Sequence, residues 1–342
     1  MFTGFIRQLQ VCKPLLVSIL SLAGIFLLPA ITKGQSTDCQ RRTVPASVID
    51  RDGFPIGGLT PARFAGTLDE APITIRDAKV DAQPRRVVVL LDVSGSMRNK
   101  AGDKWKVALQ VAGDIVSFLP AEHSVALLTF SDRVQDELGF PHSRMEIVER
   151  LKEMGTRKPP ADKSKEHTAL FGAVQKALGI LRPTRPGDVI YIISDSEENA
   201  SRKGRGDVEQ ALLAARVRVF ASLLTLCNPE WRTSDNLPPR TPIAETLARA
   251  TGGTVLHRCG LGPLGQETYV ASSEEQRKLG AALMGLYRQM AEFYQLELGL
   301  PEPVNKPHEW KLELVPGEGF SPEGFQLIYP QKLPPCVAAA AK

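Results

Sequence analysis

Residues 87–97 read Val-Val-Val-Leu-Leu-Asp-Val-Ser-Gly-Ser-Met. The run of five apolar residues predicts a buried strand of a parallel sheet. Directly after it, Asp92, Ser94 and Ser96 present one carboxylate and two hydroxyls at alternate positions, and Gly95 lets the backbone turn tightly between them. Small oxygen ligands of this kind suit a hard cation such as Mg²⁺. The pattern therefore indicates a cation-binding loop at the carboxyl end of a strand.

Two later fragments strengthen this interpretation. Thr168 begins a predicted helix in His-Thr-Ala-Leu-Phe-Gly-Ala, and Asp195 ends the largely apolar stretch that starts at Asp188. In an open parallel sheet, ligands bind at the carboxyl ends of the strands, where the strand order switches. Thr168 and Asp195 are therefore expected at the same edge of the sheet as Asp92, Ser94 and Ser96.

Together these fragments resemble the metal-ion-dependent adhesion site of the von Willebrand factor type A family. The resemblance covers about residues 86–290, and every ligand position of the family motif is matched; only Ser196 stands where the family usually has Gly. It implies that the three hydroxyls contact one Mg²⁺ (or Mn²⁺ or Ca²⁺), and that the two aspartates act directly or through water. It also implies an open coordination position, to be filled by a Glu or Asp carboxylate of a partner protein.

Strands and helices alternate after residue 86, which predicts a doubly wound, mostly parallel α/β sheet flanked by helices. The expected strands are 87–91, 125–130, 133–138 at an edge, 188–194, 217–225 and 253–257; the expected helices are 104–119, 143–154, 168–181, 207–215, 242–250 and 272–292. We divide the chain into a leader (1–34), an N-terminal β segment (35–85), the α/β domain (86–292) and a C-terminal β segment (293–342).

The two flanking segments are strand-like and are punctuated by Pro and Gly. We expect them to pair into one small β-sandwich, with the α/β domain inserted between them. Residues 48–64 also resemble the lead-in of a bacterial group of type A proteins, the von Willebrand factor-related proteins common in acidobacteria. That second resemblance rests on turn positions and on a Leu-Thr-x-x-x-Phe pattern.

The first 34 residues predict export. Two basic residues precede an apolar run over 15–31, and small or polar residues follow, as in a signal peptide; an uncleaved membrane anchor is the alternative. This leader contains three of the 42 basic residues and none of the 38 acidic ones, so residues 35–342 carry a net charge of +1. Such a balance argues against binding to nucleic acid or to an anionic membrane surface. We expect a secreted or periplasmic protein.

The cysteine content agrees with export. Beyond Cys12 there are four cysteines, Cys39, Cys227, Cys259 and Cys336, and an even number in an exported chain favours disulfides, with three connectivities open. The strand order of the resembled family implies a bridge between Cys227 and Cys259. Cys39 would then pair with Cys336, because the shared β-sandwich brings both ends of the mature chain together.

Other functions are less well supported. A hydrolase could use Ser94 or Ser96 with His167 or His123 as the base, but the chain has no Gly-x-Ser-x-Gly motif, and two carboxylates are few for a hydrolytic metal. We therefore expect a binding protein and not an enzyme, with a metal-independent scaffold subunit of an envelope complex as the alternative. Glu197-Glu198-Asn199 is interpreted as a solvated loop, and Arg205-Gly206-Asp207 as a helix start capped by Asp207.

Overall fold

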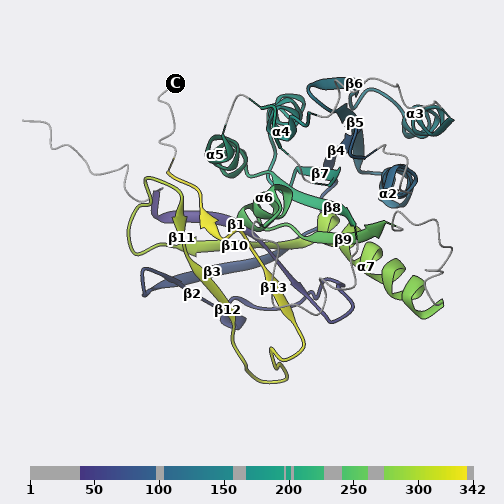
Figure 1. Ribbon diagram of the computed structural model, residues 1–342. Helices are drawn as coiled ribbons and strands as arrows, with labels where there is room; N and C mark the ends of the chain where they lie inside the picture. Colours follow the sequence, from purple (N-terminus) through teal and green to yellow (C-terminus); the bar gives the residue numbers. More distant parts are fainter. Residues whose placement is uncertain are drawn as a thin grey trace, which may run out of the picture. The chain divides into compact units, whose positions relative to one another are not determined.

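The computed structural model describes residues 39–97, 104–156, 167–195, 198–201, 204–226, 241–260 and 273–336. The chain separates into two units, residues 1–34 and 35–342, and every element described below belongs to the second. Figure 1 labels these elements in chain order.

One sheet of six strands forms the centre of the α/β domain. Its order is β6 (Val134–Leu138), β5 (Ser124–Phe130), β4 (Arg86–Asp92), β7 (Val189–Ser194), β8 (Arg218–Leu226) and β9 (Val255–Gly260). All neighbours are parallel except β5 and β6, which are antiparallel. The doubly wound, mostly parallel sheet expected from the alternation of strands and helices is confirmed.

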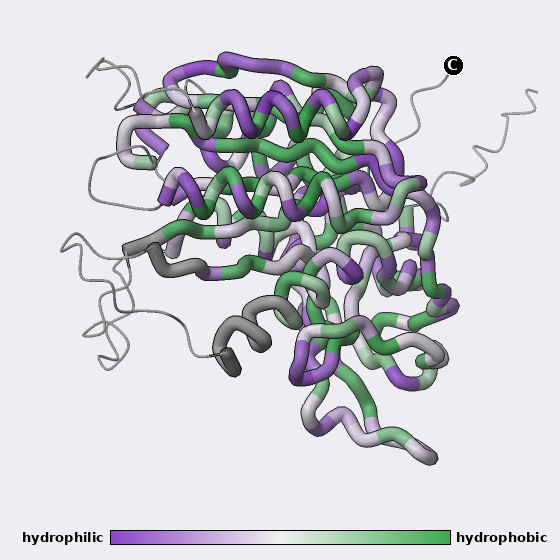
Figure 2. Tube along the Cα trace, turned by 90° about the vertical axis from the view of Figure 1, so that its right-hand side faces the viewer, coloured by the Kyte–Doolittle hydropathy of each residue, from purple (hydrophilic) through white to green (hydrophobic). Residues whose placement is uncertain are grey.

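Helices cover both faces of this sheet (Figure 1). Helices α2 (Lys104–Phe118), α3 (Arg144–Thr156) and α7 (Ser273–Ala291) pack with the residues of β4 that point to one face, and α4 (Leu170–Ile180), α5 (Arg205–Ala215) and α6 (Ile243–Thr251) pack with those that point to the other. Successive residues of a strand face opposite sides, so β4 is apolar throughout because both of its faces are buried. Figure 2 shows hydrophobic and hydrophilic segments alternating along the helices, as expected for helices with one buried face.

A second sheet is built from both ends of the described chain. Its order is β12 (Lys311–Leu314), β2 (Phe64–Leu68), β3 (Ala71–Asp81), β10 (Phe293–Gly299), β1 (Arg41–Ile49) and β13 (Gln326–Ile328). Strand β10 lies between β1 and β3 and pairs antiparallel with both, so strands from before and after the α/β domain share one ladder. The short helix η1 (Pro61–Arg63) precedes β2.

The expected β-sandwich is only partly shown. One curled six-stranded sheet encloses a separate apolar core, and its two edge strands, β12 and β13, also contact each other. Strands β11 (His308–Glu309) and β14 (Lys332–Leu333) pair with each other outside this sheet. Within the described residues, nothing else resembles a second layer of the β region. The predicted pairing of the two flanking segments is confirmed, whereas two packed layers are not shown.

A disulfide joins the two ends of the β region. Cys39 and Cys336 are bonded, with their Cα atoms 5.5 Å apart, as predicted. The other predicted bridge lies outside the described residues, because Cys227 is not described and only the backbone of Cys259 is.

Arg218 connects the two sheets. It is fully buried at the start of β8; its guanidinium donates to the carbonyl oxygen of Gln289 at 2.8 Å, to that of Gly252 at 3.0 and 3.1 Å, and to Ser47 Oγ of β1 at 3.0 Å. The ring of Phe293, the first residue of β10, lies 4.6 Å from its guanidinium carbon. Burial lowers the pKa of Arg218 below its usual value. The contacts of a single side chain thus tie together the sheet that carries the candidate site and the sheet built from the two flanking segments.

Several predicted boundaries shift by a few residues. Helix α4 begins at Leu170 and not at Thr168, and Asp207 lies in the first turn of α5 instead of capping it, since Gly204 holds the cap position. Strand β2 has only a weak local pattern, because its sequence Phe-Ala-Gly-Thr-Leu is short and contains a Gly.

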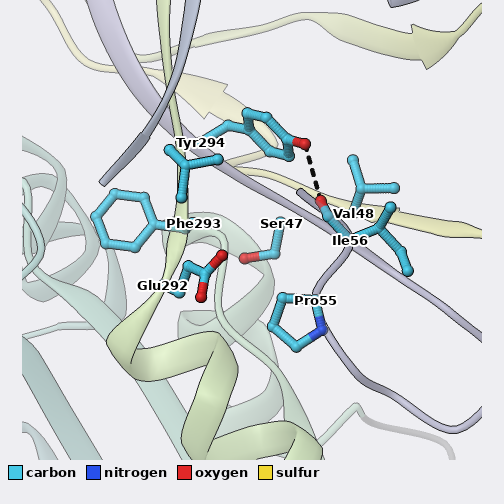
Figure 3. A pocket seen from close by; sticks show the side chains of 8 residues that line it. Ser47, Val48, Pro55, Ile56, Glu292, Phe293 and Tyr294 are labelled. Atoms are coloured by element: carbon cyan, nitrogen blue, oxygen red, sulfur yellow. Dashed lines mark hydrogen bonds between the residues drawn. The ribbon is translucent and has the colours of Figure 1, made fainter. Parts of the chain in front are cut away.

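Two further features bear on where function can lie. Among the described residues, no helix is long and apolar enough to cross a membrane. Figure 3 shows a small cavity between β1 and β10, beside the hydrogen bond from Tyr294 Oη to the carbonyl oxygen of Ile56. Its volume of about 10 Å³ leaves room for one water at most, so it is not a ligand site.

Candidate metal site

The candidate site lies where the strand order of the α/β sheet switches. Strand β4 is central, the chain continues from it to β5 on one side, and β7 is its neighbour on the other side. The loops that follow β4 and β7 therefore leave the same carboxyl edge next to each other. This is the position at which open α/β sheets bind ligands.

Asp92 is the buried base of the site. It is fully inaccessible; its Oδ2 accepts a hydrogen bond from Ser194 Oγ at 2.6 Å, and its Oδ1 accepts one from the backbone N–H of Ser94 at 2.9 Å. The parallel register pairs Leu91 with Ile193, which brings Ser194 beside Asp92. Burial raises the pKa of Asp92 to about 6, although the hydrogen bonds from both serines lower it. A carboxylate in this setting is stabilised by a nearby positive charge.

Ser94 and Ser96 present their hydroxyls together. Their Oγ atoms are 3.1 Å apart, Ser94 is buried and Ser96 is half-buried. The loop that carries them is tied to the next strand by a hydrogen bond from Val93 N to the carbonyl oxygen of Phe130, at 2.8 Å. The hydroxyl pair is thus held at the carboxyl edge by the sheet itself.

Thr168 is fixed by its backbone and not by its side chain. Its N–H donates to Asn199 Oδ1 at 2.8 Å, and its carbonyl accepts from the N–H of Asn199 at 3.0 Å. The residue is fully buried, and its Oγ1 has no hydrogen-bond partner. A buried hydroxyl without a partner costs about 1–3 kcal/mol, so it points to a ligand that completes it.

Residues 198–201 make structural contacts that the interpretation of 197–199 as a solvated loop did not anticipate, although Asn199 is exposed. Glu198 accepts hydrogen bonds from the N–H of Phe171, in the first turn of α4, and from Ser201, while Asn199 holds Thr168 as described above. These contacts join the loop after β7 to the loop before α4. Glu197 lies outside the described residues.

Asp195 has two differently engaged oxygens. Its Oδ2 is 3.1 Å from Lys104 Nζ, and both side chains are more than nine-tenths buried. Its Oδ1 is buried and has no hydrogen-bond partner. The site therefore contains two buried, unpartnered oxygen atoms, one on Thr168 and one on Asp195.

These residues fit a hard divalent cation. Hydroxyl and carboxylate oxygens are the ligands that Mg²⁺, Mn²⁺ and Ca²⁺ prefer, and the unpartnered oxygens are among the five residues predicted from the sequence. A soft-metal site is not supported, because within the described ranges no cluster of three or more His, Cys, Asp and Glu side chains could hold an ion.

Of the two histidines considered for hydrolysis, His123 is not placed to act as a base for the serines. His123 lies just before β5, at the amino end of a strand parallel to β4, and so at the opposite edge of the sheet from Ser94. His167 is exposed beside Thr168.

Sequence reasoning missed three participants: Ser194, Lys104 and Asn199. Ser194 could have been found, because a serine that ends an apolar strand one residue before Asp195 must lie at the same edge. The positions of Lys104 and Asn199 depend on how α2 and the loop after β7 fold back onto the site, for which the sequence carries no local pattern.

A family model with the description "von Willebrand factor type A domain" matches residues 87–198, about a third of the chain. The match spans the strands and loops that supply all five predicted ligand residues.

Solved structures similar to this chain include BatB from Bacteroides thetaiotaomicron, with 16% identity and a TM-score of 0.41, covering 59% of this chain and 98% of that one. An aerotolerance-related membrane protein from Bacteroides fragilis is similar at 14% identity and a TM-score of 0.42, covering 60% of this chain and 98% of that one. Proximal thread matrix protein 1 of the mussel byssus, with a zinc-occupied adhesion site, is similar at 12% identity and a TM-score of 0.45, covering 65% of this chain and 50% of that one. A search of curated proteins finds no match.

Proposed function

We propose that this protein is an exported protein-binding module that holds a divalent cation and engages an acidic partner through it. The cation would lie among Asp92, Ser94, Ser96, Thr168 and Asp195, and Mg²⁺ is the preferred ion, with Mn²⁺ and Ca²⁺ as alternatives. The family model over residues 87–198 supports the domain type. The partner would be a protein that supplies a Glu or Asp carboxylate, and neither nucleic acid nor a membrane surface is expected as a ligand.

One observation carries this proposal. Thr168 Oγ1 and Asp195 Oδ1 are buried without hydrogen-bond partners, in residues that the ligand pattern had selected beforehand. A bound cation supplies the positive charge that such oxygens lack and leaves room for a ligand from outside. Ser94 and Ser96 add two hydroxyls that already lie within 3.1 Å of each other.

Export and the bacterial subgroup belong to the same proposal. The basic and apolar leader, and the disulfide between Cys39 and Cys336, fit an oxidising compartment outside the cytoplasm. The β sheet formed by both flanking segments agrees with the resemblance to the bacterial von Willebrand factor-related proteins, which carry a β region before the adhesion domain.

A scaffold that works without a metal is the second candidate, and one contact favours it. Lys104 already neutralises Asp195 in the structure, so part of the site is satisfied by the chain itself. No catalytic role is proposed, because the chain has no Gly-x-Ser-x-Gly motif and two carboxylates are few for a hydrolytic metal.

Cation titration tests the proposal. Calorimetry with Mg²⁺ and with Mn²⁺ should detect binding to the wild-type protein but not to Asp92→Asn, which keeps the shape of the side chain and removes its charge. Asp77→Asn, on β3 of the other sheet, is the matched control and should bind like the wild type. Circular dichroism should show that both variants are folded. Equal cation affinity in the wild type and in Asp92→Asn would refute the site.

Partner capture separates the two candidates. Protein immobilised with Mg²⁺ should retain an acidic partner from an envelope extract and should release it on chelation. A partner that stays bound in excess chelator, and that binds Asp92→Asn equally well, would establish the scaffold instead.

A further inference from the structure

The predicted set of ligand residues does not explain why a buried lysine, Lys104, lies at the site. It is the first residue of α2, and its side chain, 9% exposed, ends 3.1 Å from Asp195 Oδ2. A buried lysine is stable only when its charge is paired, and here Asp195 pairs with it. The ammonium group of Lys104 is therefore paired with one carboxylate oxygen of Asp195, which is itself a proposed cation ligand.

The charges at the carboxyl edge follow from these contacts. Asp92 and Asp195 contribute two negative charges and Lys104 contributes one positive charge, so these three described side chains together have one net negative charge in the absence of metal. With a divalent cation the site would have one net positive charge. Without the lysine the same site would be neutral when loaded. Because the site is buried, these differences in net charge act through a low dielectric and are only weakly screened by salt.

We propose that Lys104 is a built-in counter-cation, which lowers the affinity of the site for divalent metal by neutralising Asp195. This inference rests on the proposed function and deepens it, because it names the residue that sets how tightly the cation is held. The free Oδ1 of Asp195 remains available to a metal while Oδ2 is held by Lys104. The lysine thus weakens the site without blocking it, and it leaves a positive charge that attracts an acidic partner.

The test is a Mn²⁺ titration by calorimetry of the wild-type chain and three variants. Lys104→Gln removes the charge but can still donate a hydrogen bond to Asp195, and we expect it to bind Mn²⁺ at least about tenfold more tightly. Lys104→Arg retains the charge and should stay near the wild-type affinity. The matched control is Lys106→Gln, an equal charge change at an exposed position of the same helix, and it should not alter affinity.

Thermal unfolding with and without Mn²⁺ gives a second measurement that does not depend on heats of binding. The shift in Tm caused by Mn²⁺ should be larger for Lys104→Gln than for the wild type. If Lys104 only supports the fold, its removal should lower Tm in chelator and leave Mn²⁺ binding unchanged or weaker, and that result would overturn the inference.

The outcomes also distinguish this inference from the proposed function. Wild-type binding with no gain in Lys104→Gln would remove the counter-cation role and keep the metal site. Binding by Lys104→Gln alone would support the counter-cation and show that the natural chain is closed to metal, as the scaffold candidate requires. Absence of binding in every variant would overturn both.

Discussion

Two buried threonines differ in whether the protein supplies hydrogen-bond partners for their hydroxyls. Thr168 and Thr251 are both fully or nearly fully buried threonines of the α/β domain. Thr251 Oγ1 donates to the carbonyl oxygen of Leu247 and accepts from Val219 N, whereas Thr168 Oγ1 has no partner. The same change at the two positions should therefore have opposite consequences.

We expect Thr168→Val to leave metal-free stability unchanged or to raise it by about 1 kcal/mol, because it removes an unsatisfied hydroxyl and keeps the side-chain volume. Thr251→Val should cost about 1–3 kcal/mol, because it leaves buried partners unpaired. Urea unfolding in chelator measures both. Added Mg²⁺ should raise the Tm of Thr251→Val but not that of Thr168→Val, since a ligand stabilises only the state that binds it. Equal losses of stability in chelator would show that the Thr168 hydroxyl is satisfied.

His123 should make stability depend on pH. Both of its ring nitrogens are buried without hydrogen-bond partners, and burial lowers its pKa; the nearby Arg85 and Arg144 add to this effect, while Glu122 opposes it. The unfolded chain then binds a proton more readily than the folded one, so stability from this residue is complete above pH about 6.5 and is lost as pH falls below it. Urea unfolding from pH 8 to pH 5 should show this loss, and His123→Leu should reduce the pH dependence. If His123→Leu had the same pH dependence of stability as the wild type, another residue would be responsible for that dependence.

At the scale of elements, two loops from distant parts of the sequence act as one unit. Asn199 bonds both the N–H and the carbonyl of Thr168, and Glu198 accepts from the first turn of α4. These hydrogen bonds between the two loops set the distance between Thr168 and Asp195. No strand of the sheet controls that distance directly.

We expect Asn199→Ala to weaken Mg²⁺ binding by about tenfold and to lower stability by about 1 kcal/mol, since it removes one side-chain hydrogen bond to a buried N–H. Calorimetry and urea unfolding in chelator separate the two effects. Asn305→Ala, at an exposed position of the β region, is the control and should change neither. A loss of stability with full cation affinity would show that Thr168 holds its position without Asn199.

At the scale of the whole molecule, the disulfide closes the β region around the inserted domain. Cys39 and Cys336 are separated by 297 residues, so the bridge restricts nearly the entire unfolded chain. Reduction, or Cys39→Ser with Cys336→Ser, should lower stability by about 2–5 kcal/mol, the range typical for loss of a native disulfide. The Tm with and without reductant measures this, and the double variant should respond less than the wild type, since of the two predicted bridges it keeps only that between Cys227 and Cys259. An unchanged Tm on reduction of the wild type would mean that the pairing of β1 with β10 already holds the ends together.

The sequence predicted the elements of the α/β domain well because their patterns are local and strong. Runs such as Val87–Leu91 are apolar on both faces, and the helices show one buried stripe, so both periods are visible without any tertiary information. The β region was harder. Strands β2, β11 and β14 are short. The pairings of β2 with β12 and of β1 with β10 join residues far apart in the sequence, so nothing local distinguishes one curled sheet from two packed layers.

By itself, the sequence determined the chemistry of the candidate site. The types and spacing of Asp92, Ser94 and Ser96, followed by Thr168 and Asp195, select hard oxygen ligands at the carboxyl edge of a parallel sheet, because strand ends are set by local hydrophobicity and turn residues. Only the tertiary structure decided which of these oxygens are already satisfied. Ser194 bonds Asp92, Lys104 pairs with Asp195, and Asn199 holds Thr168, whereas one oxygen of Thr168 and one of Asp195 have no partner. The reason is that hydrogen bonds and ion pairs between distant residues depend on how helices and loops pack onto the sheet, and that packing leaves no periodic signal in the chain.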